Sequence, residues 1–72
     1  MEEFVLTTSH ITLGQLLKHC ALIQSGGQAK QFLLENEVRV NGTAERRRGR
    51  KLVSSDVVEV EGWDTIKIVP KQ

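Results

Sequence analysis

Apolar side chains recur at helical spacing in two stretches of the first half of the chain. The first stripe consists of Leu13, Leu16, Leu17, Cys20 and Ala21, and the second of Ala29, Phe32 and Leu33. Residues three and four apart lie on the same face of a helix, so each stripe would bury one face in a common core. The spacing predicts a first helix over residues 13–21 and a second helix that starts soon after Ser25.

Both predicted helices are preceded by the pattern of a capping box. In this motif a hydroxyl residue and a glutamine three positions later satisfy each other's free backbone N–H groups. Thr12 and Gln15 form the pattern before the first helix, and Ser25 and Gln28 form it before the second. Asn36 is expected to end the second helix, because asparagine tolerates the left-handed backbone conformation that often follows a helix.

After the second helix the apolar residues alternate, which is the period of a strand with one buried face. The alternation predicts strands around Val38–Val40, Val58–Val60 and Ile66–Ile68, the last ending near Pro70. Asn41 and Gly42 predict a tight turn, and Phe4–Leu6 is interpreted as an edge strand. The predicted fold class is therefore α+β, a two-helix hairpin packed on a small antiparallel sheet.

The length of 72 residues leaves room for one modest core, so we expect a single domain over residues 1–72. Cys20 is the only cysteine, which excludes an internal disulfide and is typical of a reducing compartment. The chain begins with acidic residues, and no apolar stretch approaches the roughly 20 residues that span a bilayer. We expect a monomer of the cytoplasm with no membrane partner.

Half of the ten lysines and arginines stand within six consecutive positions, although the net charge of the chain is only +1. The cations of this basic segment, residues 46–51, are Arg46, Arg47, Arg48, Arg50 and Lys51, with Gly49 among them. Predicted strands on both sides hold the segment in place, so its cations would form a fixed pattern. Arginine binds phosphate oxygens with two parallel hydrogen bonds, which favours a nucleic-acid site over the alternative of a solvated surface loop.

The order of these elements resembles the S4 RNA-binding domain over residues 11–61. Residues 25–29, 38–42 and 56–60 carry the resemblance and read SGGQA, VRVNG and DVVEV. Three blocks narrow the resemblance to one subgroup of S4 proteins. They are ITLGQLLK at residues 11–18, SGGQAK at 25–30 and RRGRKL at 47–52. With these blocks the chain is similar to the small stand-alone S4-like proteins of the YaaA/YbcJ type.

The resemblance implies an αL-type S4 fold and a compact bacterial module that binds structured ribosomal RNA or ribosome-associated particles. It also implies an RNA surface formed by the helix pair and by the loop after the Asn-Gly hairpin. Many S4 domains carry arginine at the positions of Thr12 and Gly26 and aspartate at that of Gly14, and this chain departs from them at all three. More of the attraction for RNA is therefore expected from the basic segment.

Five further residues are candidates for contact with RNA, and each also has a purely structural interpretation. Gly26 and Gly27 leave backbone N–H groups open at the positive end of a helix dipole, which suits a phosphate, but a glycine pair equally suits a tight connection. Lys30 lies one turn inside the second helix and either reaches the same phosphate or stays solvated. Two more cations either contact RNA or stay solvated. They are Lys18, on the polar side of the first helix, and Arg39, which points outward from a strand.

These features predict a non-catalytic RNA-binding protein in which RNA shape, rather than base identity, sets selectivity. The alternative is a protein-interaction module whose basic segment docks on an acidic patch of a ribosomal or replication partner. The sequence contains no paired carboxylates in an apolar setting, no Ser/His/Asp set and no glycine-rich nucleotide motif, which argues against an enzyme. His10, His19 and Cys20 lack the spacing of a zinc site, so no metal or other cofactor is expected.

Overall fold

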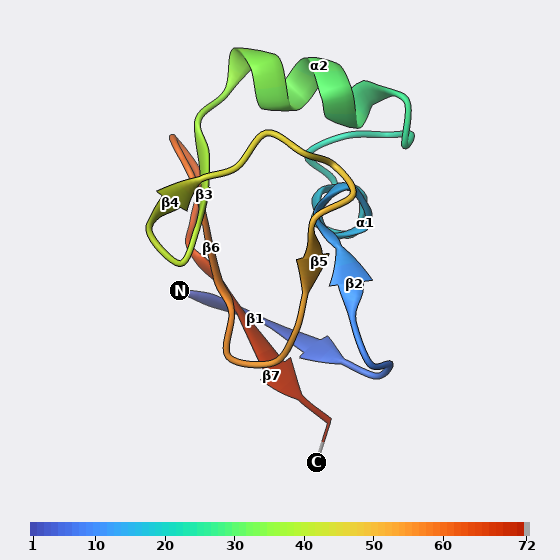
Figure 1. The fold of residues 1–72 in the computed structure, drawn as a ribbon, viewed down its shortest axis with the longest axis vertical. Coiled ribbons are helices and arrows are strands. Elements are labelled where there is room, and N and C mark those ends of the chain that lie inside the picture. The colour runs from blue at the N-terminus through green and yellow to red at the C-terminus, as the bar shows by residue number, and fades with distance from the viewer. Residues whose placement is uncertain (72) are drawn as a thin grey trace.

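The computed structural model describes residues 1–71, which form two helices, a five-stranded sheet and a two-stranded ribbon (Figure 1). In chain order the elements are β1 (Glu2–Leu6), β2 (Ile11–Thr12), α1 (Leu13–His19), α2 (Gln28–Glu35), β3 (Val38–Val40), β4 (Thr43–Ala44), β5 (Lys51–Leu52), β6 (Val57–Val60) and β7 (Ile66–Pro70). The predicted α+β fold class is confirmed.

The five-stranded sheet has the strand order β1-β7-β6-β3-β4. The pairs β3–β4, β3–β6 and β6–β7 are antiparallel, as predicted. β1 lies at the edge, also as predicted, but it runs parallel to β7, with Glu2 beside Ile66 and Leu6 beside Pro70. The expectation of a purely antiparallel sheet is wrong at this edge, because alternating apolar residues determine which face is buried and not the direction of the neighbouring strand.

The core lies between the helices, the ribbon and one face of the sheet. The largest fully buried side chains are Leu13, Leu16, Leu17, Leu52, Ile66, Ile68, Val38, Val40 and Val58, which include most of the predicted apolar positions. Cys20 and Phe32 are partly buried against this core. Burial raises the pKa of the Cys20 thiol, and the nearby Glu2 carboxylate raises it further. The thiol is therefore protonated at neutral pH and contributes to the core, as predicted.

The capping box of α1 is confirmed, since the Gln15 N–H donates to Thr12 Oγ1 at 3.2 Å and the Thr12 N–H donates to Gln15 Oε1 at 3.0 Å. The helix ends at His19, two residues earlier than predicted. Ala21 has a left-handed backbone with φ of 62°, and this residue turns the chain away from α1.

The predicted capping box of α2 is only half formed. Gln28 Oε1 accepts the N–H groups of Gln24 at 2.6 Å and Ser25 at 3.3 Å, but the N-cap residue is Gly27 and no side chain caps the helix. A preceding turn explains the difference. The N–H groups of Gln28 and Ala29 donate to the backbone carbonyls of Ser25 and Gly26, so the Ser25 hydroxyl has no free amide to cap.

The expected left-handed conformation of Asn36 is wrong, because its backbone is extended with φ of −126°. Asn36 still ends α2, but by a different interaction. Both its backbone N–H and its side-chain amide donate to the carbonyl of Phe32, at 2.9 and 3.1 Å. The chain continues straight into β3, so it needs no left-handed residue at this point.

Replacing Ala21 with glycine is expected to stabilise the protein. A left-handed alanine strains its Cβ, and removing this strain outweighs the entropy that glycine loses on folding, for a net gain of about 0.5 to 1 kcal/mol. Ala44→Gly is the matched control, because Ala44 is also exposed but lies in β4 without a positive φ. This control should lose about 0.5 to 1 kcal/mol in chemical unfolding. Equal losses in both variants would contradict the assignment of strain to Ala21.

Candidate functional site

A buried carboxylate organises the basic segment. Glu45 follows β4 directly, and only 7% of the residue is exposed. Its oxygens accept the N–H groups of Arg46 at 3.2 Å and Arg47 at 3.1 Å, and Nε and Nη2 of Arg47 at 3.0 and 3.1 Å. Arg50 Nη1 adds a fifth hydrogen bond at 2.9 Å. A buried charge needs such partners, so the segment is folded around Glu45 rather than lying free in solvent.

These contacts determine the ionisation of Glu45. The hydrogen bond from the Arg47 guanidinium is the main reason that the pKa of the Glu45 carboxyl falls from 4.5 to about 2. Burial opposes this change, whereas Arg50 and the backbone N–H of Arg47 reinforce it. The same ion pair raises the pKa of Arg47. Glu45 is therefore fully charged at neutral pH, and two of the five cations of the segment are paired within the protein.

The backbone of the basic segment packs on the start of α1. The N–H of Leu13 donates to the carbonyl of Arg50 at 2.8 Å, and the N–H of Gly14 donates to that of Arg48 at 2.9 Å. These are amides that a helix cannot satisfy by itself. A Cβ at position 14 would lie 3.4 Å from both the Cβ and the carbonyl oxygen of Arg48, so Gly14 leaves room for this close approach.

Arg48 connects the basic segment to the start of α2. Its Nη1 lies 3.4 Å from the carbonyl oxygen of Gly26, a long hydrogen bond that places the guanidinium beside the turn before the helix. In the described part of the chain, the N–H groups of Gly26 and Gly27 donate to no protein group, whereas those of Gln28 and Ala29 are already bonded. The two glycine amides are thus the ones left open for an anion.

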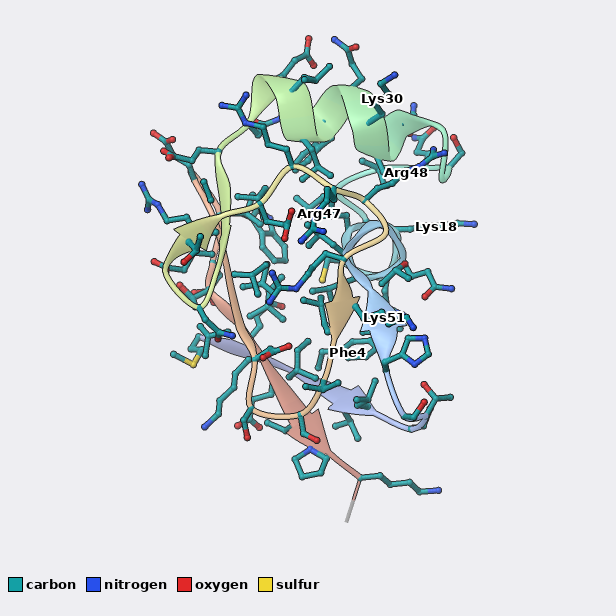
Figure 2. All side chains as sticks on the ribbon, in the orientation of Figure 1. Phe4, Lys18, Lys30, Arg47, Arg48 and Lys51 are labelled. Carbon is teal, nitrogen blue, oxygen red and sulfur yellow. The ribbon has the colours of Figure 1, made fainter. Side chains whose placement is uncertain are left out.

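Four cations from separate elements face one side of the molecule. Figure 2 shows Lys30 on α2, Arg48 in the loop, Lys18 on α1 and Lys51 on β5 following one another along this side. All four are exposed, and the pairing of Lys51 with Thr12 in the β5–β2 ribbon holds the lower end of the row against α1. We call Lys18, Lys30, Arg48 and Lys51 the basic face. Gly26 and Gly27 adjoin it through Arg48.

Arg39 and Arg46 lie in acidic surroundings. Arg39 forms an ion pair with Glu37 at 3.1 Å and stands opposite Glu59 of β6. Arg46 lines a hollow of about 290 Å³ beside α2 whose rim includes Glu35, Glu37 and Glu61. The structure thus brings together Lys18, Lys30, Arg48, Lys51, Gly26 and Gly27, and it places Arg47 and Arg50 next to them around Glu45. Arg39 and Arg46 do not join this group.

Sequence reasoning did not find Glu45 or the role of Gly14. The available signals were a single carboxylate immediately before five cations, and a glycine in the first turn of a helix. Within residues 1–71, no group of three or more histidine, cysteine or acidic side chains is arranged to hold a metal ion. No helix of the described residues is long and apolar enough to cross a membrane.

Comparison with known proteins extends the resemblance seen in the sequence. The model of the S4 domain family matches residues 4–69. The "Probable ribosome maturation protein RlbA" of Bacillus subtilis (strain 168) is 55% identical over 64 residues, which cover 89% of this chain and 90% of that protein. The "Putative RNA-binding protein YbcJ" of Escherichia coli (strain K12) is 38% identical over 53 residues, or 74% of this chain and 76% of that protein.

The Glu45 ion pairs should make stability depend on pH in the acid range. The pKa of Glu45 is lower in the folded state than the ordinary 4.5, so its contribution is complete above that value and is lost as the pH falls towards about 2. Glu45→Gln should cost about 1 to 2 kcal/mol at pH 7, with a smaller difference from wild type as the pH falls through this window. Urea unfolding at a series of pH values measures both the cost at pH 7 and its decrease at lower pH. Glu61→Gln, at an exposed position, is the control. A constant difference between the wild-type and Glu45→Gln curves would contradict the assignment.

Proposed function

Because this chain belongs to the S4 domain family, we propose that it is a non-catalytic RNA-binding protein whose basic face holds the phosphates of structured ribosomal RNA. The observation that carries the proposal is the arrangement of Lys18, Lys30, Arg48 and Lys51. They come from four separate parts of the chain and follow one another along one side of the molecule (Figure 2). Such a row of exposed cations suits the regularly spaced charges of a nucleic-acid backbone.

The construction of this face favours recognition of RNA shape. Arg48 is held by the hydrogen bond that its carbonyl accepts from the Gly14 N–H of α1 and by its contact with Gly26, and Lys51 belongs to a paired strand. Cations on such rigid supports match a fixed arrangement of phosphates better than a mobile single strand. The bases of double-helical RNA lie in a deep, narrow major groove that side chains cannot read, so backbone geometry is the available signal.

The open N–H groups of Gly26 and Gly27 would add a neutral contact to the same row. They lie before the first turn of α2, where the helix dipole favours an anion. Arg48 stands beside them, so one phosphate oxygen would accept a hydrogen bond from an amide while the guanidinium binds another. This arrangement gives the glycine pair a binding role in addition to its role in the connection between the helices.

The uneven distribution of charge compensates for the small net charge of +1. Glu35, Glu37 and Glu61 gather around the hollow beside α2, away from the basic face. An approaching polyanion is therefore attracted by one side and repelled by another, which orients the protein before contact. A ribosomal or pre-ribosomal particle is the partner we propose, in line with the name of the Bacillus subtilis relative, a probable ribosome maturation protein. We further propose that the protein acts there as a monomer in the cytoplasm.

A salt series with purified ribosomal RNA tests the proposal. Each phosphate contact contributes about 0.7 to 0.9 to the slope of log affinity against log salt, so Arg48→Gln with Lys51→Gln should flatten the slope by about 1.5. Neither side chain takes part in the Glu45 ion pairs, so the double variant should remain folded in thermal melts. The change is measured by fluorescence anisotropy or filter retention.

The matched control is Lys67→Gln with Lys71→Gln, which removes the same charge from exposed positions in and after β7. Its slope should stay within a few tenths of the wild-type value. Equal flattening by both double variants would mean that total charge, and not the basic face, drives binding. Binding without any salt dependence would overturn the proposed function itself.

A further inference from the structure

Arg47 and Arg50 belong to the basic segment, yet they are already paired with Glu45. A guanidinium group carries five N–H donors. Glu45 engages Nε and Nη2 of Arg47 and Nη1 of Arg50, which leaves donors on both groups. The Arg47 side chain is 76% exposed and that of Arg50 34%, whereas the Glu45 side chain is 8% exposed. The carboxylate is thus hidden beneath two guanidinium groups that still reach solvent.

We propose that Glu45 is a positioning residue that forms a phosphate subsite from Arg47 and Arg50. This inference rests on the proposed function and adds one specific contact to it. Nη2 of Arg47 and Nη1 of Arg50 both bind Oε1 of Glu45, at 3.1 and 2.9 Å, so the two groups lie next to each other. The carboxylate offsets the repulsion between them and leaves a local charge of one positive unit facing solvent.

The benefit of this arrangement is preorganisation. A free arginine side chain loses rotamer freedom when it binds, and this loss reduces affinity. Arg47 is instead fixed by two parallel hydrogen bonds to Glu45, and the backbone N–H groups of Arg46 and Arg47 hold the same carboxylate from the loop side. The subsite lies beside the basic face, because the intervening Arg48 belongs to that face and its carbonyl is bonded to α1.

A simpler interpretation is that Glu45 only neutralises part of the basic segment. The two interpretations predict opposite effects for Glu45→Gln, which makes the protein more positive by one unit. If Glu45 merely cancels charge, the variant should bind RNA more tightly and with a steeper salt slope. If Glu45 positions the arginines, the variant should bind more weakly, because glutamine keeps only one acceptor oxygen and its NH2 group would face guanidinium donors that it cannot bind.

The experiment measures the binding of a synthetic RNA stem-loop by wild type, Glu45→Gln and Glu61→Gln over a range of salt concentrations. Glu61→Gln makes the same change in charge at an exposed position away from the segment. For Glu45→Gln we expect about tenfold weaker binding and a slope shallower by about one unit, which corresponds to the loss of one phosphate contact. Glu61→Gln should bind as tightly as wild type or slightly more tightly.

Thermal melts of the same samples ensure that only folded protein is compared. Unchanged or tighter binding by folded Glu45→Gln overturns the positioning role and leaves the proposed function intact. Failure of the wild type to show salt-dependent binding overturns both. Arg47→Lys provides a second variant that keeps the charge but loses the planar fork, and it should also weaken binding about tenfold. Wild-type affinity in Arg47→Lys would equally overturn the subsite.

Discussion

The ion pairs of Glu45 are the interaction on which the geometry of the basic segment depends. Five cations within six positions repel one another, and a free loop of this composition would spread into solvent. Glu45 instead accepts hydrogen bonds from the guanidinium groups of Arg47 and Arg50 and from the backbone N–H groups of Arg46 and Arg47. The backbone of this segment then reaches α1, where the carbonyls of Arg48 and Arg50 accept N–H groups that the helix leaves open. One buried carboxylate thereby links charge compensation, loop shape and helix capping.

The fold consequently sorts the cations of the chain by environment. Lys18, Lys30, Arg48 and Lys51 are exposed along one side, and Arg47 and Arg50 are oriented around a carboxylate beside them. Arg39 and Arg46 lie among glutamates. Although the net charge is only +1, positive and negative side chains lie on different sides of the surface. This distribution suits a small protein that binds a polyanion in one orientation. The same sorting explains why the six-residue run alone is a poor guide to which cations are free.

Features set by local chemistry could be predicted from the sequence. The Thr12 capping box, the alternating strands, the S4 resemblance and the apolar stripes within α1 and α2 are confirmed, whereas Ala21 of the predicted first stripe lies beyond α1 and is exposed. Two errors have local causes, since a turn before α2 replaces the Ser25 cap and α1 ends before Ala21. The other errors concern features that depend on what lies beyond the element itself. The direction of β1 depends on its neighbour β7, and the state of Asn36 depends on where the chain goes after α2. Burial of Glu45 was equally hidden, because a single glutamate before a loop is usually solvated and only the tertiary fold supplies its partners.

The central claim is that structured RNA binds along the basic face and the adjoining basic segment. A titration of the isotope-labelled protein with a ribosomal RNA fragment, followed through its backbone amide NMR signals, tests this most directly. The account predicts the largest shifts at Gly26, Gly27, Lys30 and residues 46–51, while the amides of β1 and of β3 around Arg39 stay nearly unchanged. Shifts centred on the sheet around Arg39, with residues 46–51 unaffected, would contradict the account.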